Sequence, residues 1–219
     1  MRAAWWVLGA GQFDARAFVF VDECGTHTSL APVYGYSPRG ERVHLEVPRN
    51  RGPNTTLLAS MSVEGMGECL AVEGATTKVL FETYVERVLA PDLRAGQVVV
   101  MDNLSAHKGE RVRELIEARG CEVLYLPPYS PDLNPIEEAF SKIKGLLRRA
   151  AARTREALID ALGRAISSVS CTDALGFFEW CEPIFPDSAH SQLPAFGACS
   201  ASNSTGGRYP RLECNRFWL

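Results

Sequence analysis

The sequence SPDLNPIEEAF, residues 130–140, predicts the start of a helix and places a carboxylate in its first turn. Pro131 and Pro135 bracket a tight turn, and Asn134 is a favourable N-cap residue. A proline directly after the cap suits the first helical position, whose N–H has no partner inside the helix. Glu137 then occupies the third helical position. In isolation this glutamate indicates a capping box, in which its side chain reaches back to the backbone amide of Asn134.

Two further acidic residues end short apolar runs. Asp22 closes the run at 16–22, and Asp102 closes the run at 97–102. Runs rich in Val and Phe are typical of strands covered on both faces, and functional groups in open α/β sheets gather near the carboxyl ends of such strands. Taken singly, Asp22 could be a solvated strand end and Asp102 could lie in a turn. Neighbours in a strand point to opposite faces, so only one of Asp22 and Glu23 can face a site, and we favour Asp22.

Asp22, Asp102 and Glu137 together are suited to metal-dependent chemistry on a phosphodiester. The attacking and leaving oxygens are both charged in the transition state, and two divalent ions about 3.5–4 Å apart stabilise both. Hard cations such as Mg²⁺ prefer oxygen ligands and keep several waters, so three carboxylates from separate elements are sufficient. The sequence therefore predicts these three residues as ligands of two metal ions.

Three blocks of the sequence resemble the signature blocks of DDE transposases. They are Asp22 with Glu23 after a strand, the segment 102–107 after another strand, and the segment 126–137. In the sequence, 34 residues separate Asp102 from Glu137, which is the spacing of the insertion sequence 630, Tc and mariner superfamily. The resemblance extends from about residue 18 to residue 180.

The resemblance implies that Asp22, Asp102 and Glu137 are the catalytic residues and hold two Mg²⁺ ions, for which Mn²⁺ can substitute. It implies cleavage of double-stranded DNA at transposon ends, followed by strand transfer into target DNA, usually at a TA step. It also implies a homodimer or a larger assembly, and an RNase H-like fold.

The pattern of apolar residues and turn residues predicts the order of the elements. The expected strands cover residues 18–22, 42–47, 55–63, 98–101 and 122–126, with a further short strand at 68–73; the expected helices cover 77–89, 108–119, 135–149, 155–168 and 172–180. This order is typical of an α/β protein with an RNase H-like fold, in which helices flank a mixed central sheet. We expect a lead-in at 1–16, a single RNase H-like catalytic domain at 17–182, and a disordered tail at 183–219.

Composition limits the class of protein. With 219 residues, 46% of them hydrophobic and 22% charged, the chain can bury one substantial α/β core. No apolar run approaches the roughly 18 residues that span a bilayer, and residues 4–10 are too short for a secretory signal. The seven cysteines contain no CxxC pair, as expected for reduced thiols. We therefore expect a cytoplasmic protein that has no membrane contact. The resemblance implies that it is bacterial and associates with the nucleoid when it binds DNA.

Basic residues gather after Glu137, although the net charge of the chain is only −3. Such clusters release counterions from DNA and supply affinity that does not depend on sequence. A solvated helix face explains any single one of them equally well. The candidate DNA contacts are Lys142, Lys144, Arg148 and Arg149, together with His107 and Lys108 just beyond the second aspartate.

Only 21 residues precede Asp22, and no pair of recognition helices fits among them. Transposases of this kind read the transposon ends with an N-terminal helix-turn-helix region, so a separate helix-turn-helix subunit is one expectation. The alternatives are an inactive remnant, or a protein that binds DNA or a partner without autonomous transposition. An RNase H-like nuclease of other biology is a further alternative, which the block at 130–137 disfavours.

Overall fold

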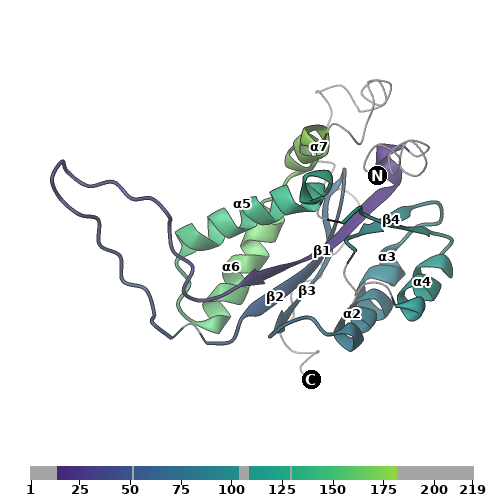
Figure 1. Ribbon diagram of the computed structural model, residues 1–219, viewed down its shortest axis with the longest axis horizontal. Helices are drawn as coiled ribbons and strands as arrows, with labels where there is room; N and C mark the ends of the chain where they lie inside the picture. Colours follow the sequence, from purple (N-terminus) through teal and green to yellow (C-terminus); the bar gives the residue numbers. More distant parts are fainter. Residues whose placement is uncertain (1–13, 51, 104–108, 129, 182–219) are drawn as a thin grey trace, which may run out of the picture.

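The computed structural model describes residues 14–50, 52–103, 109–128 and 130–181 (Figure 1). These residues form a five-stranded mixed sheet in the order β3-β2-β1-β4-β5. β1 is antiparallel to β2 and parallel to β4, so the sheet changes from antiparallel to parallel at its central strand. The strands are β1 Phe18–Thr26, β2 Thr55–Ser62, β3 Gly65–Glu73, β4 Val98–Met101 and β5 Glu122–Tyr125.

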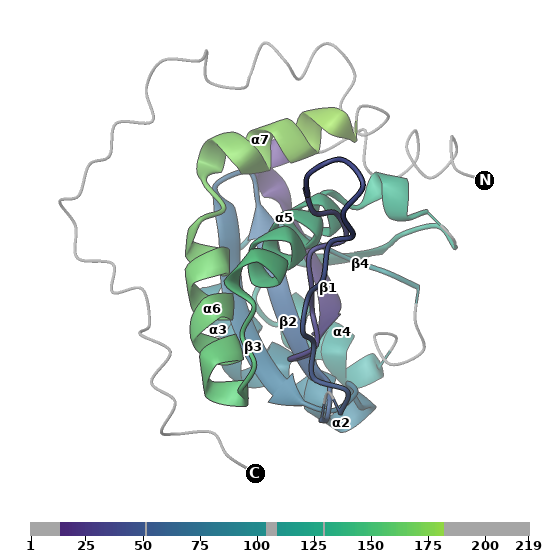
Figure 2. The same ribbon diagram turned by 90° about the vertical axis from the view of Figure 1, so that its left-hand side faces the viewer.

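Helices cover both faces of this sheet, as the two views in Figures 1 and 2 show. One face carries α5 Pro135–Ala150, α6 Arg155–Ser167 and α7 Cys171–Trp180. The opposite face carries α2 Lys78–Tyr84, the π-helical turn η3 Val85–Leu89, α3 Ala90–Asp92 and α4 Glu110–Glu117. Two short 3-10 turns, η2 Ala15–Ala17 and η4 Pro131–Leu133, precede β1 and α5.

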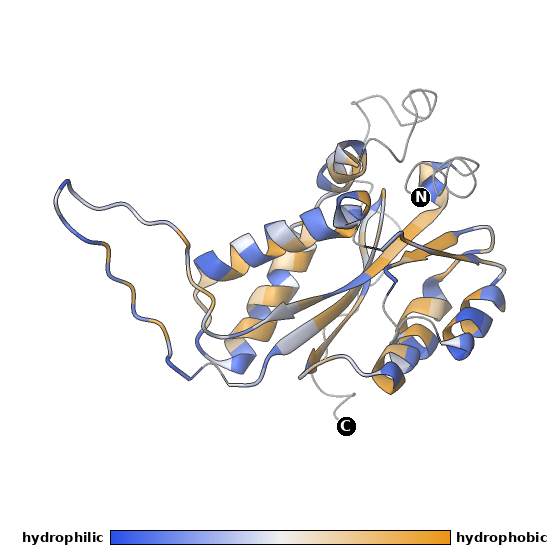
Figure 3. Cartoon of the chain, viewed as in Figure 1, coloured by the Kyte–Doolittle hydropathy of each residue, from blue (hydrophilic) through white to orange (hydrophobic). Residues whose placement is uncertain are grey.

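Alternation within β1 divides the core into two hydrophobic clusters. Phe18 and Phe20 belong to the cluster under α5, α6 and α7, whereas Val19 and Val21 belong to the cluster under α2 and α4. Both sets are buried because helices cover both faces of the strand, which explains the continuous apolar run in the sequence. Figure 3 shows the same arrangement as apolar strands between helices whose polar residues face outward.

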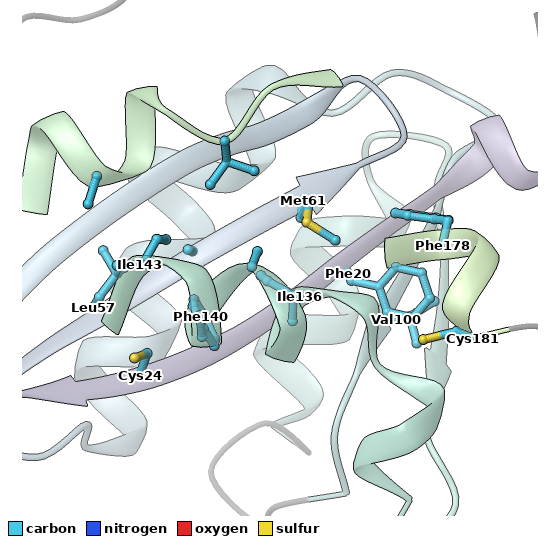
Figure 4. Packing of buried hydrophobic residues seen from close by; sticks show 14 of the residues in the cluster. Phe20, Cys24, Leu57, Met61, Val100, Ile136, Phe140, Ile143, Phe178 and Cys181 are labelled. Atoms are coloured by element: carbon cyan, nitrogen blue, oxygen red, sulfur yellow. The ribbon is translucent and has the colours of Figure 1, made fainter. Parts of the chain in front are cut away.

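The helix α5 is anchored on the sheet by one apolar face. Ile136, Phe140 and Ile143 are each at most 1% exposed and pack against β1 and β2 (Figure 4). Their spacing of three and four residues follows the helical period, so they form a single stripe. Packing of this stripe fixes where the first turn of α5 lies relative to β1.

Most of the predicted elements are present with small shifts in their ends. The strands predicted at 18–22, 55–63, 98–101 and 122–126 correspond to β1, β2, β4 and β5, and the five predicted helical segments are all helical. The predicted end of the first strand is wrong, because β1 continues four residues further, to Thr26, and Asp22 lies within it. The helix predicted at 77–89 continues through η3 to α3. The π-helical turn ends two residues before Pro91, which has no N–H to continue the ordinary α-helical bonding.

The strand predicted at 42–47 is wrong. Residues 31–50 form an arm without regular secondary structure. The arm lies between β1 and β2 in the sequence and extends away from the sheet (Figure 1). Val43, Leu45 and Val47 alternate with polar residues, which is the pattern of a half-buried strand. All three are nevertheless exposed, because the arm extends away from the sheet and the core.

The third strand in the sequence is β3, which lies at one edge of the sheet and begins three residues before the short strand predicted at 68–73. It pairs with β2 in a tight hairpin in which Ser62 is the partner of Gly65. Gly65 has a φ of 125°, a conformation that glycine adopts readily and other residues do not. This glycine therefore sets the register of the hairpin.

Among the described residues, no helix is both long enough and apolar enough to cross a membrane. The lead-in predicted at 1–16 lies mostly outside the described residues, and the disordered tail predicted at 183–219 lies wholly outside them.

Candidate active site

The register between β1 and β4 brings two aspartates together. Val21 is paired with Met101, so the next residues along the two strands, Asp22 and Asp102, lie level with each other. Neighbouring strands are about 4.8 Å apart, and residues at the same level of a parallel pair point to the same face. Phe20, two residues before Asp22, packs under α5. Both aspartates therefore face the side of the sheet that α5 covers.

Asp22, Asp102 and Glu137 line one pocket with a volume of about 410 Å³. The two aspartates come from the sheet, and Glu137 comes from the first turn of α5. The adjacent acidic residues Glu23 and Glu138 do not line it. The pocket is completed by Asn103, Leu126, Pro127, Pro128, Ser130, Pro131 and Asn134.

The carboxylate of Asp22 is buried and hydrogen-bonded on both oxygens. Its Oδ1 accepts a hydrogen bond from the backbone N–H of Glu23 at 2.7 Å, and its Oδ2 accepts one from Nδ2 of Asn134, also at 2.7 Å. Asp22 is only 6% exposed. Hydrogen bonds to an ionised carboxylate are stronger than those between neutral groups. Two such bonds to opposite oxygens fix the orientation of this side chain.

Asn134 occupies the N-cap position of α5 and Pro135 the first helical position, as predicted, but the capping box is absent. The Asn134 side chain makes no cap hydrogen bond. Its backbone N–H donates to the carbonyl oxygen of Pro131 at 2.9 Å, within the 3-10 turn that precedes the helix. That N–H is consequently not available to the side chain of Glu137.

The contact between Asn134 and Asp22 was not predicted from the sequence. The two residues are 112 positions apart. An asparagine before a proline at a helix start indicates a cap, and nothing in that local pattern indicates a carboxylate from another element. Only the packing of α5 across β1 brings them together.

Glu137 faces the pocket while remaining exposed to solvent. Partial burial is the main effect on its pKa and raises it above the usual value. The positive charge of Lys144 acts in the opposite direction, and the negative charges of Asp102 and Glu138 raise the pKa further. A cation between these carboxylates would favour their ionised forms.

The predicted DNA contacts on α5 have different surroundings. Lys142 donates to Oδ2 of Asp173 at 2.6 Å and to the carbonyl oxygen of Ser168 at 3.2 Å, so its ammonium group is already paired with groups of the protein. Lys144 lies close enough to the pocket to lower the pKa of Glu137. Arg148 and Arg149 lie in the last turn of α5, whereas His107 and Lys108 lie outside the described residues.

The chemistry of the pocket suits a hard divalent cation. Its lining contains three acidic residues, two asparagines and one serine. Within the described parts of the chain, no group of three or more His, Cys, Asp or Glu residues is arranged so that it could hold a metal ion by itself. Mg²⁺ is usually bound by one or two carboxylates together with water and substrate oxygens, and this open arrangement is compatible with that.

The fold is shared with solved structures of the Mos1 mariner transposase. A pre-cleavage Mos1 transpososome has a TM-score of 0.66 at 15% identity, covering 84% of this chain and 60% of that chain. The Mos1 catalytic domain with raltegravir and Mg has a TM-score of 0.59 at 16% identity, covering 84% of this chain and 91% of that chain. At these identities the likeness establishes the fold alone. It confirms the predicted RNase H-like α/β fold, and the chain spans about 60% of the length of the Mos1 chain in the transpososome.

None of the curated proteins matches this chain. Residues 17–159, however, match the family model described as DDE superfamily endonuclease. The matched range begins just before β1 and ends within α6, so it contains the sheet and all three carboxylates of the pocket. Because the match covers more than half of the sequence, the chain belongs to the DDE superfamily endonucleases.

Proposed function

We propose that this chain is the catalytic half of a transposase, which cleaves DNA strands at transposon ends and transfers them into target DNA. The observation that carries the proposal is the register between β1 and β4. It sets Asp22 and Asp102 side by side, facing Glu137 across one pocket, in a member of the DDE superfamily endonucleases.

In this proposal Asp22, Asp102 and Glu137 are the catalytic residues and hold two Mg²⁺ ions, for which Mn²⁺ can substitute. Bound divalent ions would activate a water or a DNA 3′-hydroxyl and stabilise the charge on the departing oxygen. The chain itself orients the carboxylates. The backbone of Glu23 and the side chain of Asn134 hold Asp22, and the packed stripe of α5 holds Glu137.

The proposed substrate is double-stranded DNA, first as transposon ends and then as target DNA at a TA step. The similar Mos1 structures include a paired-end complex with the left transposon end and a paired-end complex with Mn. They support end DNA as the substrate, a homodimer or larger assembly, and the use of divalent metal. Among the predicted basic residues, Lys144, Arg148 and Arg149 are the ones we propose to contact the DNA backbone.

Recognition of the transposon ends is proposed to reside in a helix-turn-helix segment or in a separate helix-turn-helix subunit. The residues that the structure describes form the catalytic fold, and the chain spans about 60% of the length of the Mos1 chain that it resembles. We expect the assembled enzyme to act in the bacterial cytoplasm, on DNA of the nucleoid.

The test is a nicking assay on a labelled duplex that carries the ends of the element encoding this chain. It is run with Mg²⁺ or Mn²⁺, with and without a helix-turn-helix partner. We expect metal-dependent nicking that falls to background in Asp102→Asn and Glu137→Gln. Glu138→Gln is the matched control, because it removes a neighbouring charge that does not line the pocket. Nicking that persists in both pocket variants would refute the assignment.

A further inference from the structure

The side chain of Asn134 is turned away from the helix that it precedes. Its Nδ2 donates to Oδ2 of Asp22 at 2.7 Å, and both residues are buried, with Asn134 4% and Asp22 6% exposed. An ionised carboxylate has no hydrogen to donate and can only accept a hydrogen bond. The amide therefore presents its nitrogen, and not its oxygen, to Asp22. The other end of the amide, Oδ1, is buried and has no hydrogen-bond partner among the residues that the structure describes.

This arrangement is unfavourable for the stability of the helix start. At the N-cap position an asparagine normally accepts a hydrogen bond from an N–H of the first helical turn through its side-chain oxygen. The side chain of Asn134 does not make that bond. Its buried Oδ1 also has no partner among the described residues, which lowers the stability of the folded state further. Unsatisfied buried groups in folded proteins call for an explanation, and a functional role is one of the common ones.

The bond also joins the two elements that carry the carboxylates. Asp22 lies on β1, and Asn134 lies three residues before Glu137, at the start of α5. A rigid contact between them fixes the distance between the sheet and the first turn of α5. The same contact prevents rotation of the Asp22 carboxylate, since the backbone N–H of Glu23 holds its other oxygen.

We propose that Asn134 is a positioning residue for the carboxylate pocket, and that its amide holds Asp22 in the orientation in which that carboxylate binds a divalent cation. The proposal rests on the proposed function of Asp22 as a metal ligand. Groups that hydrogen-bond a metal ligand typically change metal affinity by about 10- to 100-fold when they are removed. Asn134 needs no contact with DNA or with the ion itself to have this effect.

The test measures Mn²⁺ affinity of the full chain, without DNA, from the electron paramagnetic resonance signal of free Mn²⁺. The informative variant is Asn134→Ser, because serine is a good N-cap residue but is too short to reach Asp22. We expect Mn²⁺ to bind at least about tenfold more weakly. The new cap bond raises the melting temperature without metal, whereas loss of the donor to the buried Asp22 carboxylate lowers it, so Mn²⁺ affinity is the deciding measurement. Asn134→Ala removes the bond without offering a cap and should show the same loss of affinity.

Thr26→Val is the matched control. Thr26 is buried on the same strand, donates one hydrogen bond to the carbonyl oxygen of Thr55 at 3.1 Å, and does not line the pocket. Its variant should keep Mn²⁺ affinity within about twofold. An equal loss of affinity in Thr26→Val and Asn134→Ser would overturn the proposal, because it would indicate a general effect of loosening β1.

Asp22→Asn separates the inference from the function on which it rests. If Asp22→Asn binds Mn²⁺ as tightly as the parent chain, the assignment of Asp22 as a ligand fails, and the role of Asn134 fails with it. If Asp22→Asn loses affinity while Asn134→Ser and Asn134→Ala keep it, only the positioning role of Asn134 is overturned.

Discussion

The ammonium group of Lys142 lies 2.6 Å from Oδ2 of Asp173 and ties α5 to α7. The same carboxylate accepts hydrogen bonds from the backbone N–H and the hydroxyl of Ser170, and Ser170 in turn accepts from the N–H of Asp173, which completes a capping box at the start of α7. Together these bonds hold α7 against the helix that carries Glu137.

This tether predicts a loss of stability in acid. The hydrogen bonds from Lys142 and Ser170 lower the pKa of Asp173 from 3.8 to about 2. A folded-state pKa below the unfolded value stabilises the fold above pH 3.8, and this stabilisation disappears as the pH falls toward 2. Asp173→Asn should be destabilised at neutral pH by about 1 kcal/mol, because it loses the charged acceptor of the bonds from Lys142 and Ser170. Melting temperatures measured from pH 7 to pH 2 should converge for the two proteins.

Asp160→Asn is the control for this measurement, because Asp160 is exposed on α6 and takes no part in the tether. Its melting curves should follow those of the parent chain at each pH. A constant difference between Asp173→Asn and the parent from pH 7 to pH 2 would contradict the role of the Asp173 charge.

Phe140 is predicted to be the residue on which the attachment of α5 depends most. It is 1% exposed and lies in the middle of the stripe that faces β1 and β2. Phe140→Ala removes a fully buried ring and leaves a cavity, so the free energy of unfolding should fall by about 3–5 kcal/mol. Urea denaturation measures this loss. Ser141→Ala, at the next and exposed position, should change the same quantity by less than about 0.5 kcal/mol.

The central strands and the glutamate helix could be predicted from the sequence because each has a strong local pattern. The run at 98–101 is apolar throughout, as expected for a strand with helices on both faces, and Pro135 marks the start of its helix directly. Asp22 and Asp102 could be selected because both end such runs. Their alignment in space depends on the pairing of Val21 with Met101, which no local pattern encodes.

The features that the sequence did not reveal depend on contacts between distant segments. Alternation at Val43 and Leu45 predicts a strand, yet a strand needs a backbone partner, and residues 31–50 form no strand pairing among the described residues. The basic residue Lys142 has the same sequence context as its neighbours, and only the position of α7 shows that its charge is paired within the protein. Local pattern therefore predicts elements better than it predicts their partners.

The base of the arm is predicted to depend on Arg153. Its Nη1 donates to the carbonyl oxygens of Thr28 and Leu30, each at 2.9 Å, and so joins the turn after α5 to the residues between β1 and the arm. Arg153→Lys keeps the charge but replaces a planar donor group with a compact ammonium that cannot reproduce this geometry. The free energy of unfolding should fall by about 1–3 kcal/mol, as measured by urea denaturation.

A local measurement distinguishes this effect from a general loss of stability. The backbone N–H of Leu30 donates to the carbonyl oxygen of His27 at 3.2 Å. In Arg153→Lys this amide should exchange its hydrogen faster, while amides of β4 keep their relative protection. Arg164→Lys, on the exposed side of α6, should leave the exchange at Leu30 unchanged. Equal exchange at Leu30 in all three proteins would show that Arg153 does not brace the arm.

The last turn of α5 is predicted to supply part of the affinity for DNA. Arg148 is partly exposed and Arg149 is exposed, whereas the charge of Lys142 is paired with Asp173. Binding of a short duplex weakens with salt because each phosphate contact releases counterions, and each contact contributes about one unit to the slope of log affinity against log salt. The double variant Arg148→Gln and Arg149→Gln should therefore reduce that slope by about two. Arg164→Gln removes one positive charge from an exposed position of α6 and should leave the slope unaltered. Equal slopes for all three proteins would remove α5 from the DNA interface.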